Sequence, residues 1–372
     1  MSRYRLLPTP SQQRAMVVHC DHARFVWNLA VEQHGHWRPG RTPAPGFAAQ
    51  ARQLTAARAE FAWLAAGSVT VQQQALRDFH QAVKQFMAGT HGRPTWRKAG
   101  RHAGFRQVAV SPEHIVRLSH RIGSVWIPKV GIVRFVWSRA VSDGVKSYRV
   151  TFDRAGRWHI AFAVRPEPIP APGNGQVVGI DRGVAVTAAL STGEMLRMAG
   201  LTPGERRRLR LFRRRMSRGS RGSRRRERNR IRIARLLARE TNRRRDWMEK
   251  TTTDLARRFD RIRIENLTVA AMTRSARGTR AEPGRNVRAK AAINRGILAA
   301  GWGTLVRRLQ DKAVGRVEKV ASAYTSQICN ACGHRARESR KNQADFQCVT
   351  CGHQANADVN AARNIAAGRA VT

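Results

Sequence analysis

The chain has 372 residues and a formal net charge of +46, which arises from 70 Lys and Arg side chains against 24 Asp and Glu. An enzyme that acts on small molecules has no use for such an excess of positive charge. A protein that binds a dense polyanion, such as nucleic acid, does need it. The length indicates two or three domains, and a hydrophobic content of 42% indicates globular rather than disordered structure.

The first quarter of the chain is predicted to be mainly helical. Residues 2–7 form a short expected strand. Apolar periodicity then predicts three helices, and Ser68 is the expected N-cap of the last one. These helices cover residues 11–36, 48–66 and 68–87.

The pattern changes to β-structure after a Gly-, Pro- and Arg-rich break at 89–104. From 104 to 165 the sequence alternates between apolar and polar residues, and DRAG at 153–156 is a predicted hairpin turn. These strands predict a small barrel or a curled sheet. The stretch PEPIPAPGNG at 166–175 is then the clearest domain boundary in the chain.

The second half mixes strands with helices. Strands are expected in VVGID, in the following VAVTAAL, in RIRIEN at 261–266 and in RVEKVAS. One long amphipathic helix is expected at 293–313, with an apolar stripe of Leu298, Trp302, Leu305 and Leu309. Trp302 on this stripe is more consistent with a core residue than with a base-stacking surface. The segment NADVNAARNIA predicts a final helix.

Residues 204–250 contain 21 Arg and Lys but only 5 acidic residues. Thin apolar stripes predict two basic helices that the segment 217–223 separates. A charge run is usually a solvated face, but a run so dominated by one sign repels itself and favours an external polyanion. The candidate nucleic-acid contacts are Arg206, Arg207, Arg208, Arg213, Arg214, Arg215, Arg224, Arg225 and Arg226.

Four of the five cysteines form two closely spaced pairs near the C-terminus. Cys329 and Cys332 are separated by two residues, fifteen residues follow, and Cys348 and Cys351 repeat the spacing. This pattern predicts a tetrahedral zinc site, and four thiolates leave no open position, so the zinc would be structural. His334 and His353 are then spare surface residues. Cys20 is expected to be a buried helix residue, and cysteine usage of this kind suits a reducing cytosol.

Three carboxylates stand out from the acids that are expected to pair with arginine. Asp181 follows the apolar run VVGI, where burial without a partner is costly. Glu265 ends RIRIE on the same strand face as Arg261 and Arg263, so a salt bridge is the alternative reading. Asp358 starts the last helix on its packing side, although an acid there also interacts favourably with the helix dipole.

Convergence of these three acids would create an anionic cage that only divalent metal makes tolerable. Two Mg²⁺ ions bound by carboxylates are the recurring solution for phosphodiester hydrolysis. The charge and the acids together therefore predict a nuclease or a strand-transfer enzyme. Glu194 is expected at the surface, whereas Asp254 and Asp260 are expected to pair with nearby arginines.

At these motifs the chain resembles the TnpB family encoded by bacterial insertion sequences. The resemblance rests on GIDRGV, RIRIENLTVAAM, YTSQICNACG, FQCVTCGH and NADVNAARNIA, in that order. It also extends to the N-terminal segment and to 293–313, and hence to nearly the whole length. Members are RNA-guided DNA endonucleases that are related to type V CRISPR effectors and were long described as transposases.

The resemblance implies an α+β and α/β multidomain fold. It places the nuclease carboxylates at Asp181, Glu265 and Asp358, which would bind Mg²⁺, and zinc at the four cysteines. It further implies a wedge-like β-barrel, a helical recognition insert, an RNase H-like RuvC domain and a zinc ribbon. The corresponding ranges are 1–10 with 90–168, 11–89, 176–325 with 354–372, and 326–353.

The expected function is that of a guide-RNA-dependent, Mg²⁺-dependent DNA endonuclease, with guide RNA and double-stranded target DNA as partners. The expected location is the cytoplasm, at the nucleoid when the protein is bound to DNA. Two alternatives remain open. One is a guided DNA- or RNA-binding regulator that does not cleave. The other is a transposase that acts directly on the ends of the mobile element.

Overall fold

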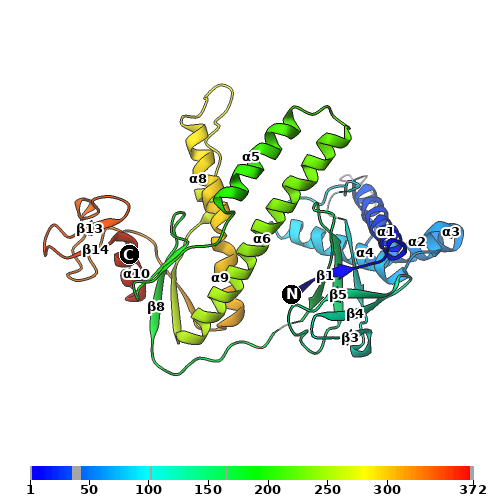
Figure 1. Cartoon of the computed structure of the whole chain (residues 1–372), viewed down its shortest axis with the longest axis horizontal. Coiled ribbons are helices and arrows are strands. Elements are labelled where there is room, and N and C mark those ends of the chain that lie inside the picture. The colour runs from blue at the N-terminus through cyan, green and yellow to red at the C-terminus, as the bar shows by residue number, and fades with distance from the viewer. Residues whose placement is uncertain (1, 36–42, 101–102, 165, 369–372) are drawn as a thin grey trace. The chain divides into compact units, whose positions relative to one another are not determined.

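The computed structural model describes residues 2–35, 43–100, 103–164 and 166–368. The chain divides into two compact units (Figure 1). The first contains Met1–Pro166 and Phe212–Arg235, and the second contains Glu167–Leu211 and Leu236–Thr372. In the described part of the chain, no helix is both long and apolar enough to cross a membrane.

The helices of the first unit follow the apolar periodicity closely. After β1 (Ser2–Leu7) come α1 (Pro10–Gly35), α2 (Phe47–Glu60), α3 (Ala62–Ala65) and α4 (Val69–Met87). The Ser68 hydroxyl accepts the Val71 amide at 3.4 Å, which confirms the predicted N-cap. The helix expected at 48–66 is interrupted, because Phe61 takes an extended conformation between α2 and α3. Residue 36, the predicted end of the first helix, lies outside the described residues.

Seven strands of the first unit form one antiparallel sheet, in the order β2-β6-β7-β1-β5-β4-β3. Strand β1 joins its two halves, since residues 2–5 pair with β7 and Leu6 and Leu7 pair with β5. The remaining strands are β2 (Gly104–Val108), β3 (Ile115–Arg117), β4 (Ile122–Ile127), β5 (Gly131–Val136), β6 (Ser147–Phe152) and β7 (Trp158–Ala163). The order ends at β2 and β3 without pairing between them, so the described sheet is open and the predicted barrel is not closed.

A second sheet forms the centre of the second unit, in the order β10-β9-β8-β11-β12. Strands β8, β11 and β12 run parallel, whereas β9 is antiparallel to both of its neighbours, β8 and β10. The bounds are β8 (Val177–Asp181), β9 (Ala188–Leu190), β10 (Met195–Leu196), β11 (Arg261–Glu265) and β12 (Val317–Val320). Its apolar core includes Ile180, Ile262 and Ile264 from the sheet, with Leu255 and Leu305 from the helices.

The helices of the second half are α5 (Pro203–Ser217), α6 (Arg224–Arg258), α7 (Val269–Met272), α8 (Val287–Ala300), α9 (Trp302–Lys312) and α10 (Ala357–Ala366). Helices α5 and α6 run side by side as a hairpin (Figure 1), and the predicted break between the two basic helices is confirmed. A small hairpin of β13 (Asp345–Gln347) and β14 (Gln354–Asn356) precedes α10.

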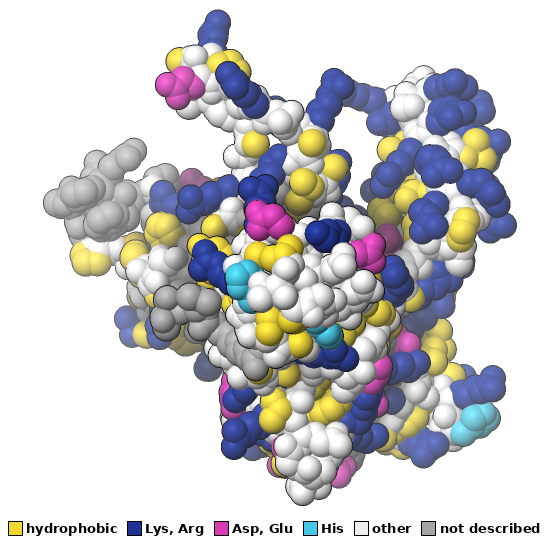
Figure 2. Space-filling model, turned by 90° about the vertical axis from the view of Figure 1, so that its left-hand side faces the viewer, with side chains coloured by type: hydrophobic (Ala, Val, Ile, Leu, Met, Phe, Trp, Pro, Cys, Tyr) yellow, Lys and Arg dark blue, Asp and Glu magenta, His cyan; other side chains and the backbone are white. Residues whose placement is uncertain are grey.

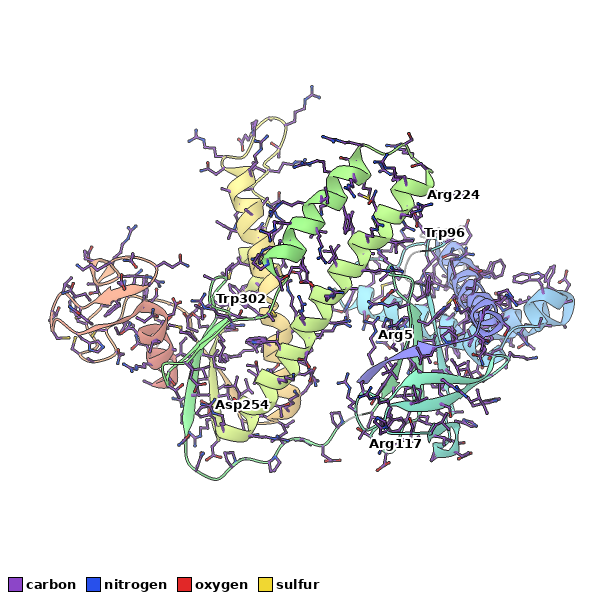
Figure 3. All side chains as sticks on the ribbon, in the orientation of Figure 1. Arg5, Trp96, Arg117, Arg224, Asp254 and Trp302 are labelled. Carbon is purple, nitrogen blue, oxygen red and sulfur yellow. The ribbon has the colours of Figure 1, made fainter. Side chains whose placement is uncertain are left out.

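The single helix expected at 293–313 is wrong, because Gly301 adopts a left-handed conformation (φ 67°) and separates α8 from α9. The break also splits the predicted apolar stripe. Leu298 is 64% exposed, whereas Trp302, Leu305 and Leu309 are buried. Trp302 is a core residue, as expected, and its indole donates a hydrogen bond of 3.2 Å to the Gly183 carbonyl (Figure 3).

Candidate functional site

Two of the three candidate acids end neighbouring parallel strands. In the β8–β11 pair Ile180 lies opposite Ile264, so the next residues, Asp181 and Glu265, reach the same edge of the sheet. The carboxyl ends of parallel strands are the common place for sites in such sheets. Their side chains lie close enough for Glu265 to raise the pKa of Asp181 and for Asp181 to lower the pKa of Glu265, and the register explains this closeness.

Helix α10 brings the third acid to this edge. Its first turn is capped by the Asn356 side chain, which accepts the amides of Asp358 at 3.0 Å and Val359 at 3.3 Å. The helix packs directly on β8 at Gly179, where an added Cβ would lie 2.0 Å from the Ala362 carbonyl oxygen. The absence of a side chain at Gly179 therefore permits the approach that places Asp358 near Asp181.

The three carboxylates interact electrostatically. Burial, the Glu265 carboxylate and then the Asp358 carboxylate raise the pKa of Asp181 to about 7. Burial likewise raises the pKa of Glu265 and of Asp358. A cluster of acids that resists ionisation in this way gains free energy from cations, which is the property expected of a metal or phosphate-processing centre.

Cationic and hydroxyl groups that the sequence interpretation did not single out surround the acids. Arg182 is buried, donates to the Glu265 carbonyl and lowers the pKa of that acid. Thr325 is buried, lies near the Glu265 side chain and lowers its pKa, and Arg340 lies 3.5 Å from Asp358. Of these three residues, only Arg182 could have been recognised from the sequence, because it directly follows Asp181. Thr325 and Arg340 are distant in sequence and are placed by the fold.

The alternative reading of Glu265, a salt bridge to Arg261 or Arg263, is not found among the described residues. Arg263 pairs with Glu318 at 2.7 Å and donates to the Ala366 carbonyl at 2.7 Å. Of the other acids, Asp254 pairs with Arg258 as expected. The pairing expected for Asp260 is wrong, because its carboxylate accepts the backbone amides of Gly173 and Gly175.

Glu194 lies at the surface, as expected, and takes part in an ion pair there. Its carboxylate binds the Arg258 guanidinium, and this contact is the main reason why its pKa is lowered. The side chain remains 41% exposed. Glu194 is therefore a partly exposed ion-pair residue on the β9–β10 turn rather than part of the acid cluster.

The four cysteines form a compact cluster. Their sulfur atoms all lie within 4.8 Å of one another, with Cys329–Cys351 at 3.7 Å and Cys332–Cys348 at 3.6 Å. Metal–sulfur bonds of about 2.3 Å in a tetrahedron require sulfur separations of about 3.8 Å. Among the described residues no set of three carboxylates is packed this tightly, so Asp181, Glu265 and Asp358 are spaced more widely than the thiols.

The two cysteine pairs have the same backbone geometry. The amides of Cys329 and Cys348 bond to the carbonyls five residues later, and Gly333 and Gly352 have φ values of 77° and 72°. Glycine permits this left-handed turn at the tip of each knuckle. His334 is exposed and His353 bonds through its Nε2 to the Asn330 side chain at 3.0 Å, which leaves the four sulfurs as the ligand set.

Helices α5 and α6 present most of the candidate arginines to solvent. Eight of the nine are exposed, and Arg224 lies at the start of α6 (Figure 3). Arg226 differs, because its guanidinium donates to the carbonyls of Met216 at 2.8 Å and Gly219 at 3.0 Å. It closes the connection between the helices. Lys and Arg also outnumber acids over the face shown in Figure 2.

Glu205 fixes the base of this helical hairpin. Its carboxylate accepts the Thr202 amide at 3.0 Å and the Thr202 hydroxyl accepts the Glu205 amide, which is a capping box. It also pairs with Arg243 and Arg239 of α6, and these two contacts lower its pKa to about 2. The hairpin is thus held by a buried acid rather than by apolar contact alone.

Three family models match the chain. They are described as "Helix-turn-helix domain" at residues 2–38, "Probable transposase" at 159–276 and "Cas12f1-like, TNB domain" at 302–365. The described residues of the first match form one strand and one long helix, β1 and α1. The last match contains the cysteine cluster together with Asp358.

A protein of Escherichia coli (strain K12) named "Putative RNA-guided DNA endonuclease InsQ" is 36% identical over 99% of this chain and 92% of its own length. The chain belongs to the TnpB family. A second relative, the "Putative RNA-guided DNA endonuclease" of Streptomyces pristinaespiralis, is 30% identical over 100% of this chain and 89% of its own length.

Two further matches are named Cas12f1. The "CRISPR-associated endodeoxyribonuclease Cas12f1" of Sulfoacidibacillus thermotolerans is 53% identical over 51 residues, which are 14% of this chain and 12% of its own. A solved Cas12f1–sgRNA–target DNA complex superposes with a TM-score of 0.56 at 16% identity, over 96% of this chain and 82% of the other. This match shows a shared fold.

Proposed function

We propose that this TnpB-family chain is an RNA-guided, Mg²⁺-dependent DNA endonuclease of a bacterial insertion sequence. The observation that carries the proposal is the convergence of Asp181, Glu265 and Asp358 from two strand ends and one helix start. The names of the two full-length relatives support the same activity.

The three carboxylates offer hard oxygen ligands, which suit Mg²⁺. When bound, Mg²⁺, expected as two ions, supplies activation of water and stabilisation of the leaving oxygen in phosphodiester hydrolysis. The contribution of the chain is to hold the carboxylates in place. The Arg182 guanidinium holds the Glu265 backbone through its carbonyl, and the Asn356 cap fixes the helix turn that carries Asp358.

The cysteine cluster would bind one structural Zn²⁺. Its sulfur separations match a tetrahedral site, and no ligand position is left for water or substrate. The ribbon around it carries Arg340, which faces Asp358. We therefore assign the zinc a role in folding the ribbon and in positioning its side chains beside the acid cluster.

Guide RNA and double-stranded target DNA are the proposed partners. The exposed arginines of α5 and α6 would contact phosphates, whereas base pairing with the guide would read the sequence. We propose the wedge-like lobe, the helical recognition insert, the RuvC-like nuclease domain and the zinc ribbon as the functional divisions. Their ranges are 1–10 with 90–168, 11–89, 176–325 with 354–372, and 326–353.

The nucleic acid that co-purifies with the full chain tests this proposal. Sequencing should find one discrete RNA that ends in a variable segment. A DNA duplex that matches this segment, with randomised flanking sequence, should then be cut in Mg²⁺ and left intact in EDTA. Random fragments in place of one RNA would contradict guiding.

The same assay separates the two alternative functions. Selective binding of the matched duplex without cutting would identify a guided binder. Joining of element ends without any requirement for the RNA would identify a transposase that acts directly on them. The intact acid cluster favours cleavage over simple binding, because a binder has no use for three acids near phosphates.

A further inference from the structure

Tyr324 is the one exposed aromatic side chain in the described residues of the second unit. The other aromatics there, Trp247, Phe259, Trp302 and Phe346, are buried or half-buried, whereas Tyr324 is 42% exposed. It also has a φ of 59°, a left-handed conformation that is unfavourable for a bulky side chain. Such conformations persist where the surroundings hold them, and they gather at functional sites.

The backbone around Tyr324 is tightly held. Its carbonyl accepts the amides of Gln327 at 2.8 Å and Ile328 at 3.1 Å. The next residue, Thr325, is buried, and its carbonyl accepts the Asn364 side chain of α10 at 3.0 Å. The backbone at Tyr324 and Thr325 is thus held in part by the same helix that carries Asp358.

Arg335 covers the ring of Tyr324. Its guanidinium carbon lies 3.4 Å from the ring centroid, a close cation–π contact. The first cysteine knuckle positions this arginine, because Arg335 forms a β-bridge with Ile328. Arg335 is exposed, and no carboxylate lies within ion-pair distance of it in the described part of the chain. The positive charge is therefore available to an external anion.

The pair lies next to the acid cluster. Thr325, which directly follows Tyr324, lies close enough to the Glu265 side chain to lower the pKa of that acid. Arg340 of the same ribbon faces Asp358. Tyr324 thus adjoins a residue that lies near Glu265, and Arg335 belongs to the same ribbon as the arginine that faces Asp358.

We propose that Tyr324 and Arg335 form a stacking platform that holds one unpaired nucleotide of the substrate strand beside Asp181, Glu265 and Asp358. This inference rests on the proposed nuclease function. An aromatic ring stacks on any unstacked base, and a guanidinium both stacks and binds phosphate. A base within a duplex is not available for such stacking, so the platform selects single-stranded DNA.

Photo-crosslinking tests the platform without requiring cleavage. The probe is an oligonucleotide complementary to the variable segment of the co-purifying RNA, extended by unpaired 5-iododeoxyuridines. It is bound to the RNA-loaded full chain that carries Asp181→Asn. Peptide mass spectrometry should place the crosslink at Tyr324, and adding Tyr324→Phe should retain it. A crosslink that survives Tyr324→Asn at full yield would overturn the platform.

Cleavage kinetics in the Asp181-intact protein provide the second readout. Tyr324→Asn removes the ring. Asparagine tolerates the left-handed backbone conformation at this position, so folding should be preserved. We expect at least about a fivefold loss in the cleavage rate, with unchanged affinity for the fully paired target. Arg335→Gln should act in the same direction, whereas Arg337→Gln on the same ribbon is the control and should not.

The two proposals fail in different ways. Cleavage that proceeds at the unaltered rate in Tyr324→Asn would overturn the platform and leave the nuclease function standing. A protein with Tyr324 intact that never cuts the matched duplex in Mg²⁺ would overturn the nuclease function. The crosslink would in that case still report whether the unpaired strand reaches Tyr324.

Discussion

The Ala362 carbonyl oxygen of α10 occupies the space where a side chain on Gly179 of β8 would begin, 2.0 Å from the ideal Cβ position. The Ala366 amide is almost as close, at 2.4 Å. The contact is between backbones, which cannot move aside as a flexible side chain would. The geometry of the acid cluster therefore depends on a residue that bears no functional group.

Gly179→Ala should displace α10 and destabilise the second unit. Overpacking of this kind typically costs about 1–3 kcal/mol, and Mg²⁺-dependent cleavage should fall with it. Urea unfolding of the full chain measures the loss. Gly303→Ala on α9 is the matched control, since no atom lies near its added Cβ, and it should be neutral or slightly stabilising. Equal stability of the two variants would contradict the proposed role of Gly179.

Much of this site follows from local sequence, but its surroundings do not. The apolar run before Asp181 and the alternation before Glu265 predict two strand ends, and the register follows once the strands pair. The neighbours Thr325 and Arg340 come from distant segments that only tertiary packing brings near. Local pattern contains no information on such contacts.

Two features of the helices could not be predicted from the sequence, each for a specific physical reason. The apolar stripe from Leu298 to Leu309 continues through Gly301, so periodicity alone cannot reveal the left-handed break there. Arg226 lies within a run of exposed arginines, yet its guanidinium satisfies the carbonyls at the α5–α6 connection. The mixed α/β organisation and the cysteine spacing were accessible from the sequence, whereas backbone conformation and hydrogen-bond partners were not.

Glu205 should make the stability of the helical hairpin depend on pH. Arg243 and Arg239 lower its folded pKa to about 2, so its contribution is complete above its ordinary pKa of about 4.3 and is lost as the pH falls toward 2. Glu205→Gln should destabilise the protein at pH 7, and the difference from wild type should shrink below pH 4. Thermal unfolding across this range measures it.

Glu227→Gln provides the control for this pH dependence. Glu227 pairs with Arg230 on α6, but both side chains are largely exposed and such pairs contribute little. Its replacement should hardly change the melting temperature at any pH. A difference between Glu205→Gln and wild type that stays constant from pH 7 to pH 2 would contradict the assigned role of the Glu205 carboxylate.

Loss of one cysteine ligand should reduce both zinc content and stability. Cys348→Ser removes a thiolate, and metal-binding free energy at such a site is part of the folding free energy. Elemental analysis should find one zinc per wild-type chain and much less in the variant, with a lower melting temperature. Cys20→Ala should keep the zinc, because Cys20 is buried in α1 far from the cluster in sequence. Metal-free wild type of full stability would contradict the zinc assignment.

The arginines of α5 should contribute affinity through phosphate contacts. Replacing Arg213, Arg214 and Arg215 with Gln should weaken nucleic-acid binding. It should also reduce the magnitude of the slope of log affinity against log salt concentration by up to about 2.7, which is about 0.9 for each phosphate contact. Arg226→Gln is the comparison, because its guanidinium is engaged with backbone carbonyls and its loss should lower stability rather than the slope. An unchanged slope in the triple variant would place the phosphate contacts elsewhere.

Asp181→Asn tests the central claim most directly, because it removes a negative charge while it preserves the size of the side chain. The RNA-loaded variant, its matched duplex and Mg²⁺ should be compared with wild type for cleavage, binding and melting temperature. We predict that cleavage is lost, while binding is unchanged or tighter because fewer charges repel the phosphates. Cleavage by a folded Asp181→Asn protein at the wild-type rate would contradict the account.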